Sequence, residues 1–374
     1  MRLLINTSSA AQGGSVQVAI SFLRECCSFS EHSYGVIVGP GLAGLLKVDE
    51  FPVNFKFYFV NERPSQRLFA AVRGHIFSHI EKDFSPDCVF TTSGPSYWKS
   101  GCPHLIGYNL PHYVYRDSPY FKIISRFERI AWWARGMVIR YFYRRDANAL
   151  VVQTDDVNER ARKYLGIEDV LTVSNTCGAQ YFKTTPHVDF LPERVEGEVR
   201  LLCLSAYYDH KNLGIINSII SELKKIGIYS VRFVLTMRDD ELENNFNTKS
   251  RSMIYNVGRL SPLNAPHLYE EVDCMFLPTL LECFSASYAE AMAMKVPILT
   301  SDLSFARTVC GDAALYFDPL DPVSIAKKIG ALIRSKAMRQ ELISAGQVRV
   351  TQFNSAQQRA LAYLAKCMSL SGEK

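Results

Sequence analysis

The sequence has no apolar run that approaches the roughly 20 residues of a membrane-spanning helix, and its formal net charge is only +5. The N-terminal stretch MRLLIN is too short for a secretory signal, and no cleavage motif accompanies it. These absences argue against an integral membrane protein and against a secreted one. We therefore expect the protein to stay in the cytosol.

Cysteine pairing motifs are also missing. The ten cysteines are scattered, Cys26 and Cys27 are adjacent, and no C-x-x-C pair occurs. This spacing fits neither a disulfide framework nor a zinc site, so we expect buried or idle thiols. Internal repeats and low-complexity tracts are absent as well.

Hydrophobic residues make up 48% of the 374 residues, which is enough for two domains with real cores. In the first half, short apolar, β-branched runs alternate with segments of helical period. This pattern is typical of a parallel sheet with crossover helices. The expected strands are 2–6, 34–39, 54–60, 87–92, 104–109, 149–154 and 171–175.

The alternation stops after Lys183, where two prolines and several charges break both periods. It then resumes, with expected strands 200–206, 231–237, 252–258, 274–278, 296–302 and 313–317. We predict an α/β protein with two doubly wound domains, 1–183 and 199–350, a linker at 184–198, and a terminal helical segment at 351–374. Because ligands of such sheets bind beyond the carboxyl ends of the strands, the site is expected in a cleft between the domains.

Residues 281–302 read LECFSASYAEAMAMKVPILTSD. A helix that begins near Ser285 offers backbone N–H groups and the positive end of its dipole to an anion such as phosphate. Glu282 and Glu290 flank this helix start, and carboxylates accept hydrogen bonds from vicinal hydroxyls but repel phosphate. This layout suits a nucleotide sugar, which has hydroxyl-rich ends and a phosphate middle. As a bare pattern, two surface glutamates on an α/β crossover are the alternative.

Other strand ends carry candidate residues. Gly13 and Gly14 permit a tight turn and close ligand approach after the first strand, although such a turn is as often a plain connection. Lys211 would hold a diphosphate or be simply solvated, and Asn212 is expected to cap the next helix. His112 is either near a reacting group or an ordinary loop residue.

The 281–302 segment resembles the Glu-x7-Glu motif of the retaining glycosyltransferases of family 4, including the AEAMA run, the VPI strand and the closing aspartate. With the glycine loop and the Lys211–Asn212 pair, the resemblance covers nearly the whole chain. It implies a GT-B fold, in which two Rossmann-like domains face each other across a cleft and the C-terminal helix crosses back to the first domain. It also implies sugar transfer from a nucleotide-sugar donor with retention of configuration and without a metal.

The resemblance assigns roles on the donor side. Lys211 and the amides near Phe284 and Ser285 would hold the diphosphate. Glu290 would bind the ribose hydroxyls and Glu282 the donor sugar.

Further roles follow from the same resemblance. Gly13 and Gly14 would face the donor, and His112 would lie near the reaction centre. Many family members carry an arginine five residues before the lysine, but here that position is Ala206. Either another basic residue such as Arg259 supplies the second charge, or the lysine and backbone amides suffice.

Positive charge is concentrated between residues 116 and 145, with eight basic residues against two acidic ones. Ser118 and Pro119 suit the start of a single helix that runs to about Arg145. One face is basic and aromatic, whereas the opposite face is apolar and predicted to be core. The basic face comprises Lys122, Arg126, Arg129, Trp133, Met137, Arg140 and Arg144, and the apolar face comprises Ile124, Phe127, Ala131, Ala134, Val138 and Phe142.

The basic face suits an anionic membrane surface, where each nearby Lys or Arg contributes on the order of 1 kcal/mol and Trp lies at headgroup level. Nucleic-acid phosphates would suit the charge too, but no recognisable nucleic-acid module accompanies it, so we expect no such partner. A solvated helix face is the remaining alternative. We expect a peripheral protein on the cytoplasmic face of the inner membrane, with a polyprenyl-diphosphate-linked glycan as acceptor.

The SAYYDHKNL and TTSGPSYW segments resemble those of transferases from O-antigen clusters. The expected pathway is therefore assembly of a bacterial surface polysaccharide such as lipopolysaccharide. Two other readings stay open. One is a non-transferase GT-B enzyme such as a sugar-nucleotide epimerase; the other is a degenerate nucleotide-sugar-binding subunit, for which Ala206 is the best argument.

Overall fold

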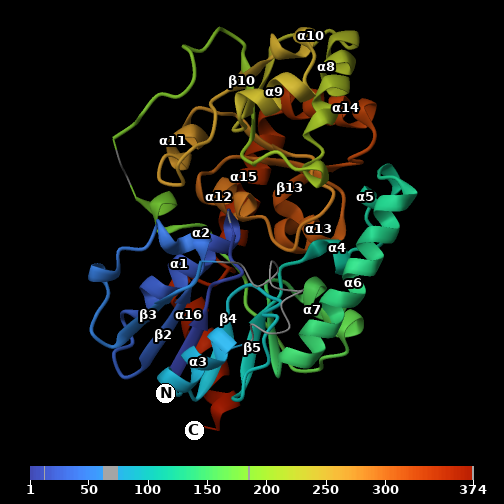
Figure 1. The fold of residues 1–374 in the computed structure, drawn as a ribbon. Helices are drawn as coiled ribbons and strands as arrows, with labels where there is room; N and C mark the ends of the chain where they lie inside the picture. The colour runs from blue at the N-terminus through green and yellow to red at the C-terminus, as the bar shows by residue number, and fades with distance from the viewer. Residues whose placement is uncertain (12, 62–74, 184–185, 373–374) are drawn as a thin grey trace. The chain divides into compact units, whose positions relative to one another are not determined.

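The structure is a computed structural model that describes residues 1–11, 13–61, 75–183 and 186–372 (Figure 1). The chain divides into two compact units. Unit 1 comprises Met1–Arg116, Ser125–Asn175 and Asn354–Lys374, and unit 2 comprises Asp117–Ile124 and Thr176–Phe353. The predicted linker includes residues 184 and 185, which lie outside the described residues, and its boundaries stay a prediction.

In the described residues, unit 1 is built on a seven-stranded sheet of order β3-β2-β1-β4-β5-β6-β7, and every neighbouring pair is parallel. The strands are β1 (Arg2–Asn6), β2 (Ser33–Val38), β3 (Phe55–Phe59), β4 (Cys88–Thr91), β5 (His104–Gly107), β6 (Ala149–Val152) and β7 (Val170–Thr172).

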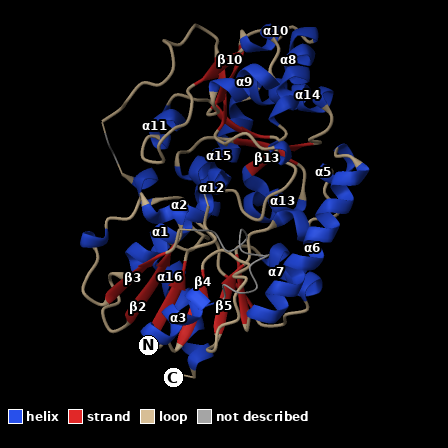
Figure 2. Ribbon diagram, in the orientation of Figure 1, coloured by secondary structure: helices blue, strands red, loops and turns tan. Residues whose placement is uncertain are grey.

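Helices cover both faces of this sheet, as Figure 2 shows. Side chains alternate along β1, so Leu3 and Ile5 join a core with α1 and α16, whereas Leu4 joins a core with α3. The helices are α1 (Gly14–Cys26), α2 (Pro40–Ala43), α3 (His75–Phe84), α4 (Pro111–Val114), α6 (Arg126–Asp146), α7 (Asp155–Leu165), α16 (Ala356–Ser371) and the short 3₁₀ helix η1 (Val48–Glu50).

Unit 2 contains a six-stranded parallel sheet of order β10-β9-β8-β11-β12-β13 in the described part of the chain. The strands are β8 (Val199–Cys203), β9 (Val231–Leu235), β10 (Ile254–Asn256), β11 (Cys274–Leu277), β12 (Ile298–Ser301) and β13 (Ala314–Phe317). The α-helices are α5 (Tyr120–Ile123), α8 (Ile216–Lys225), α9 (Asp239–Asn245), α10 (Thr248–Arg251), α11 (Ala265–Glu270), α12 (Ala286–Ala293), α13 (Ser304–Cys310), α14 (Pro322–Arg334) and α15 (Lys336–Val350). The 3₁₀ helices are η3 (Ala179–Phe182), η4 (Asp209–Lys211), η5 (Leu213–Ile215) and η6 (Gly311–Ala313).

All the strands predicted from apolar runs are present. In each unit, two strands run outward from the first strand on one side and the rest follow on the other side. This is the strand order of a Rossmann-type, doubly wound sheet. The predicted fold class, with two such sheets in one chain, is confirmed.

The C-terminal helix α16 belongs to unit 1, as the resemblance implied, and lies in Figure 1 among the elements of that unit. Tyr363 is buried, and its ring contacts Phe22 and Phe90 at centroid distances of 5.5 and 5.1 Å. The buried Arg359 donates to Ser21 Oγ at 2.8 Å and also to Asn175 Oδ1. These contacts complete one face of the first sheet.

The predicted single helix from Pro119 to Arg145 is wrong. The structure has α5 and α6 instead, because the backbone is extended at Ile124 and Ser125. Ser125 forms a capping box with Glu128, accepting from its N–H at 3.2 Å while the Glu128 carboxylate accepts from the Ser125 N–H at 2.8 Å. This local helix start ends the preceding one.

Replacing Tyr363 by Ala should lower the free energy of unfolding of unit 1 by about 3 kcal/mol, because it empties a buried aromatic site. All three tryptophans, Trp98, Trp132 and Trp133, lie in unit 1, so tryptophan fluorescence during urea unfolding reports on this unit. Leu361→Ala, at an exposed position of the same helix, is the control and should change stability by under about 1 kcal/mol. Equal effects of both variants would show that α16 is not anchored through Tyr363.

Candidate functional site

The candidate donor site lies at the carboxyl edge of the unit 2 sheet, where β8 and β11 are paired. β8 is followed in space by β9 on one side, and β11 by β12 on the other. Such a switch point is where ligands of doubly wound sheets bind, because the loops after the two strands diverge there. Lys211 comes from the first loop and Glu282 from the second.

Backbone hydrogen bonds join these two loops. The carbonyl of His210 accepts from Leu280 N at 2.7 Å and from Thr279 Oγ1 at 3.2 Å. Lys211 follows His210, and Glu282 lies two residues after Leu280, so the two side chains are brought close and Lys211 Nζ donates to Glu282 Oε1 in an ion pair. The two side chains are only 15% and 14% exposed, so both charges are largely withdrawn from water.

This ion pair determines how the site can receive an anion. A partly desolvated lysine needs a negative partner, and here the glutamate supplies it. A diphosphate entering the site would compete with Glu282 for Lys211, and the released carboxylate would then be available to accept hydroxyl hydrogen bonds.

Helix α12 begins at the same edge. Its N-cap residue Ser285 is buried and has an extended backbone, and in the described structure the Ser285 side chain makes no capping hydrogen bond. Ser287 Oγ donates to the carbonyl of Leu204 at 3.3 Å, which holds the first turn at the end of β8. Phe284 is buried, with its ring centroid 5.5 Å from that of Phe353. The helix start is therefore fixed beside the ion pair.

Glu290 is the fifth residue of α12 and lies among aromatic side chains. Tyr269 Oη donates to Glu290 Oε2 at 3.2 Å, and a further hydrogen bond comes from Tyr181. The rings of Tyr181 and Tyr269 meet edge to face at 5.9 Å. Although part of the residue contacts solvent, burial of the carboxyl group raises the pKa of Glu290 from 4.5 to about 7, against the lowering effect of the two tyrosines. Its charge thus changes near neutral pH.

Asn212 does not cap a helix through its side chain, so that prediction is wrong. It adopts a left-handed backbone with φ 55°, and its Nδ2 donates to the carbonyl of Pro319 at 2.8 Å. The 3₁₀ helix η5 follows, and α8 begins only at Ile216. The asparagine turns the chain sharply after Lys211 and fastens that turn to the loop after β13.

The second cation remains unassigned by geometry. Ala206 is exposed after β8, and Arg259 is exposed after Gly258, whose φ is 70°. That Arg259 supplies the missing charge stays a prediction.

The candidate residues of unit 1 lie at the carboxyl ends of its strands. Gly13 is the N-cap of α1 with φ 61°, a backbone that side-chain-bearing residues rarely adopt, and Gly14 is the first residue of the helix. His112 lies in α4, with its ring stacked on Trp132 of α6 at 4.2 Å and 9°. The roles of these three residues toward the donor or the reaction centre stay predictions.

The surface of α6 differs from the prediction in one important respect. The face that packs on the rest of unit 1 comprises Trp132, Gly136, Ile139 and Tyr143. A Cβ at Gly136 would lie 2.9 Å from Tyr164 Oη, so only glycine allows α6 to approach α7 this closely. The predicted core positions Phe127, Ala131, Ala134 and Val138 are exposed instead, and Phe127 is 85% exposed.

An apolar seam therefore runs along the outward side of α6. It comprises Phe127, Ile130, Ala134, Met137 and Tyr141, at alternating spacings of three and four residues. At 100° per residue, this seam lies opposite the packed face, with Arg126, Arg129, Arg140, Arg144 and Trp133 on one flank and Arg135 on the other. Lys122, predicted to share this helix, lies on α5 in unit 2 and is exposed. Among the described residues, no helix has the length and apolar character to cross a bilayer.

Sequence reasoning missed the residues that hold the site in place. Tyr181 and Tyr269 surround Glu290, and Ser118 Oγ donates to the carbonyl of Leu280 at 2.7 Å in the loop before Glu282. These residues come from distant parts of the chain and share no spacing, so no sequence pattern marks them.

The raised pKa of Glu290 predicts a pH-dependent stability. A proton bound more tightly in the folded state stabilises it fully below pH 4.5, and this contribution is lost as the pH rises to about 7. At about 1.4 kcal/mol per pKa unit, the rise from 4.5 to about 7 corresponds to a loss of at most about 3.5 kcal/mol, and partial solvent contact of the residue makes the loss smaller. Glu290→Gln should remove this pH dependence, because glutamine does not ionise. The free energy of unfolding of the variant, measured by calorimetry, should therefore rise relative to that of the wild type from about pH 5 to about pH 8. Glu243→Gln on exposed α9 should follow the wild type; parallel pH curves for wild type and Glu290→Gln would refute the assignment.

Residues 198–335 match the family model described as glycosyl transferases group 1. Comparison with curated protein sequences gives no significant match.

Solved structures match the whole chain at low identity. Sucrose-phosphate synthase from Thermosynechococcus elongatus has a TM-score of 0.75 at 13% identity, covering 100% of this chain and 99% of its own. Anabaena HepE, solved with UDP and glucose, has a TM-score of 0.71 at 13% identity, covering 99% and 100%. WaaG, a glycosyltransferase involved in lipopolysaccharide biosynthesis, has a TM-score of 0.69 at 13% identity over 100% of both chains. The chain therefore has the two-domain GT-B fold of glycosyltransferases, and within it residues 198–335 match the glycosyl transferases group 1 family.

Proposed function

We propose that the protein is a retaining glycosyltransferase that moves a sugar from a nucleotide-sugar donor to a polyprenyl-diphosphate-linked glycan. The observation that carries this proposal is the grouping of Lys211, Glu282, the start of α12 and Glu290 at the switch point of the unit 2 sheet. A cation, a helix N-terminus and two carboxylates match the diphosphate and the two hydroxyl-rich ends of such a donor.

In this proposal Lys211 and the first turn of α12 bind the diphosphate, while Glu290 accepts hydrogen bonds from the ribose and Glu282 from the sugar. Loss of the nucleoside diphosphate builds up negative charge at the diphosphate, and the lysine and the helix dipole stabilise it there. No added metal is required for this step. We assign no general base.

The acceptor side is proposed to meet the cytoplasmic face of the inner membrane through α6. An apolar seam between two arginine flanks is the composition of a helix that lies in a bilayer interface. The side chains of Phe127, Ile130 and Met137 would enter the acyl boundary while the arginines contact anionic headgroups. The proposed contact therefore combines burial of the apolar seam with charge, whereas the sequence alone indicated a basic face with a tryptophan at headgroup level.

Assembly of a bacterial surface polysaccharide such as lipopolysaccharide or O-antigen is the proposed pathway. The structural similarity to WaaG is compatible with it. A degenerate nucleotide-sugar binder is the second candidate function, because Ala206 leaves Lys211 without the family's usual arginine and Lys211 is already paired with Glu282.

Assaying a panel of nucleotide sugars for nucleotide release, with extracted lipid acceptors, should separate the proposed roles. Lys211→Ala should weaken nucleoside-diphosphate binding by on the order of 10- to 100-fold, because the variant loses a hydrogen bond between charged groups. Glu290→Gln should also weaken nucleotide binding. Glu282→Gln should lower kcat by about 100-fold with nucleotide affinity kept within about three-fold, because it addresses the sugar and its loss leaves Lys211 open to the diphosphate.

Glu243→Gln on α9 is the control and should leave binding and turnover unchanged. Calorimetric titration would give the affinities, and Mg²⁺ should not increase the rate. If the protein binds nucleotide sugars but releases no free nucleotide with any donor and acceptor, the degenerate binder is favoured. If an epimer of the sugar forms without acceptor, the protein is an epimerase.

Membrane binding can be tested with vesicles that contain anionic lipid and with neutral vesicles. The wild type should sediment with the anionic vesicles. Replacing Phe127, Ile130 and Met137 by Ser should abolish binding, because apolar burial is lost while every charge remains. Replacing Arg126, Arg129, Arg140 and Arg144 by Glu should release the protein to the supernatant.

The matched control reverses four exposed lysines of unit 2, Lys225, Lys249, Lys327 and Lys328, to Glu and so changes the net charge equally. It should keep vesicle binding. Loss of binding in this control, or its persistence in the serine variant, would remove α6 as the membrane contact.

A further inference from the structure

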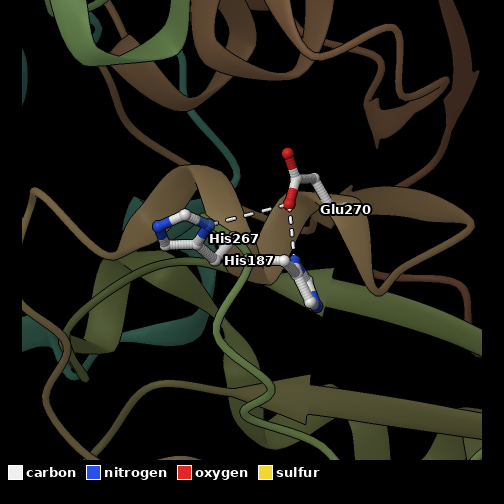
Figure 3. A group of neighbouring side chains, drawn as sticks. All are labelled: His187, His267 and Glu270. Carbon is white, nitrogen blue, oxygen red and sulfur yellow. Dashed lines mark hydrogen bonds and ion pairs between the residues drawn. The ribbon is translucent and has the colours of Figure 1, made fainter. Parts of the chain in front are cut away.

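A second cluster of chemically active side chains lies in unit 2, apart from the candidate donor residues. Among the described residues, one group of histidine, cysteine and carboxylate side chains gathers three ligand atoms within 4.8 Å of one another: His187, His267 and Glu270. Figure 3 shows both imidazole rings facing the carboxylate of Glu270. His267 and Glu270 lie one turn apart on α11, and His187 comes from the segment before β8.

The distances between the ligand atoms suit one small cation. Glu270 Oε2 is 2.7 Å from His187 Nδ1 and 3.6 Å from His267 Nδ1. Two ligands of a tetrahedral zinc ion, each about 2.0–2.1 Å from the metal, lie about 3.3 Å apart. These two distances fall on both sides of this value, and all three ligand atoms lie within 4.8 Å of one another, so side-chain rotations would have to bring them to a shared ion.

The surroundings of His187 resemble the outer shell of a metal site. Its other ring nitrogen, Nε2, lies 3.1 Å from Asp189 Oδ1. Metal-bound histidines usually donate their second N–H to such a carboxylate, which fixes the tautomer and the ring orientation. The backbone N–H groups of Phe190 and Leu191 donate to the Glu271 carboxylate at 2.7 and 2.9 Å, so the segment that carries His187 is itself held to the end of α11.

We propose that His187, His267 and Glu270 form a binding site for a divalent transition-metal ion of the zinc class, which fastens the chain before β8 to α11. Two imidazoles and one carboxylate are a zinc ligand set that leaves a fourth position for water, whereas Mg²⁺ and Ca²⁺ prefer oxygen ligands. None of the candidate donor residues belongs to this group, so the proposed transfer step does not use the metal.

The site has a structural consequence for unit 2. Tyr269 lies on α11 between His267 and Glu270 and donates to Glu290. A metal that fixes α11 would therefore also fix this tyrosine. The competing explanation is that a proton occupies the place of the metal, since Glu270 raises the pKa of His187 through a hydrogen bond and so favours a charged imidazolium.

Zinc binding to the full-length protein, freed of metal by dialysis against a chelator, decides between these explanations. Competition with a chromophoric zinc indicator and elemental analysis after dialysis should give one equivalent of Zn²⁺ that excess Mg²⁺ does not displace. His187→Ala and Glu270→Gln should lower the affinity at least about 100-fold, and Asp189→Asn by about 10- to 100-fold. Zinc should also raise the unfolding temperature of the wild type but not of His187→Ala.

Two controls keep the result specific. His79→Ala replaces an exposed histidine of α3 and should leave zinc binding unchanged. Lys211→Ala should also keep it, so failure of the donor site and failure of the metal site are distinguishable. The chain also has ten cysteines, which are possible competing ligands. If the metal binds at the proposed site, the spectrum of the Co²⁺-substituted protein should lack thiolate charge-transfer absorption. Binding well below one equivalent, or full binding in both His187→Ala and Glu270→Gln, would overturn the proposal and leave a protonated histidine–carboxylate pair.

Discussion

The parallel pairing of β8 with β11 is the constraint on which the candidate donor site depends. Because the carboxyl ends of paired parallel strands meet at one edge, the loops that carry Lys211 and Glu282 are forced together although they are far apart in the sequence. The His210 carbonyl then joins the loops through two hydrogen bonds, and the ion pair forms beside them. The start of α12 is held at the end of β8 by Ser287, so cation, carboxylate and helix N-terminus share one place.

Desolvation gives the two glutamates of this segment different chemistry. Glu282 is compensated by a lysine, whereas Glu290 receives hydrogen bonds from two tyrosines, and burial raises its pKa to about 7. A ribose that donates hydroxyl hydrogen bonds would favour the ionised form of Glu290, and an arriving diphosphate would release Glu282 from Lys211. Both carboxylates would thus complete their roles only when the donor is bound.

The strands and the fold class were predictable because buried parallel strands are short, continuous apolar runs, and these are local features of the sequence. The faces of α6 were not. Its periodicity separates an apolar side from a basic side, but it does not say which side packs. Contacts with α7 and β5 decide this, since Gly136 allows Tyr164 to approach closely and Tyr143 Oη donates to the Gly107 carbonyl. The apolar seam is consequently left outward. The break at Ser125 was missed because a capping box and a continuing helix use similar residues.

By itself the sequence determined the two sheets, the Glu-x7-Glu segment and the position of Lys211 after a strand, because each depends on neighbours along the chain. Only the tertiary structure decided that Lys211 pairs with Glu282, that Tyr181 and Tyr269 surround Glu290, and that His187 meets α11. These contacts join segments separated by long stretches of chain. Packing and desolvation select them in the folded state, and no spacing in the sequence records which distant side chains will share a buried position.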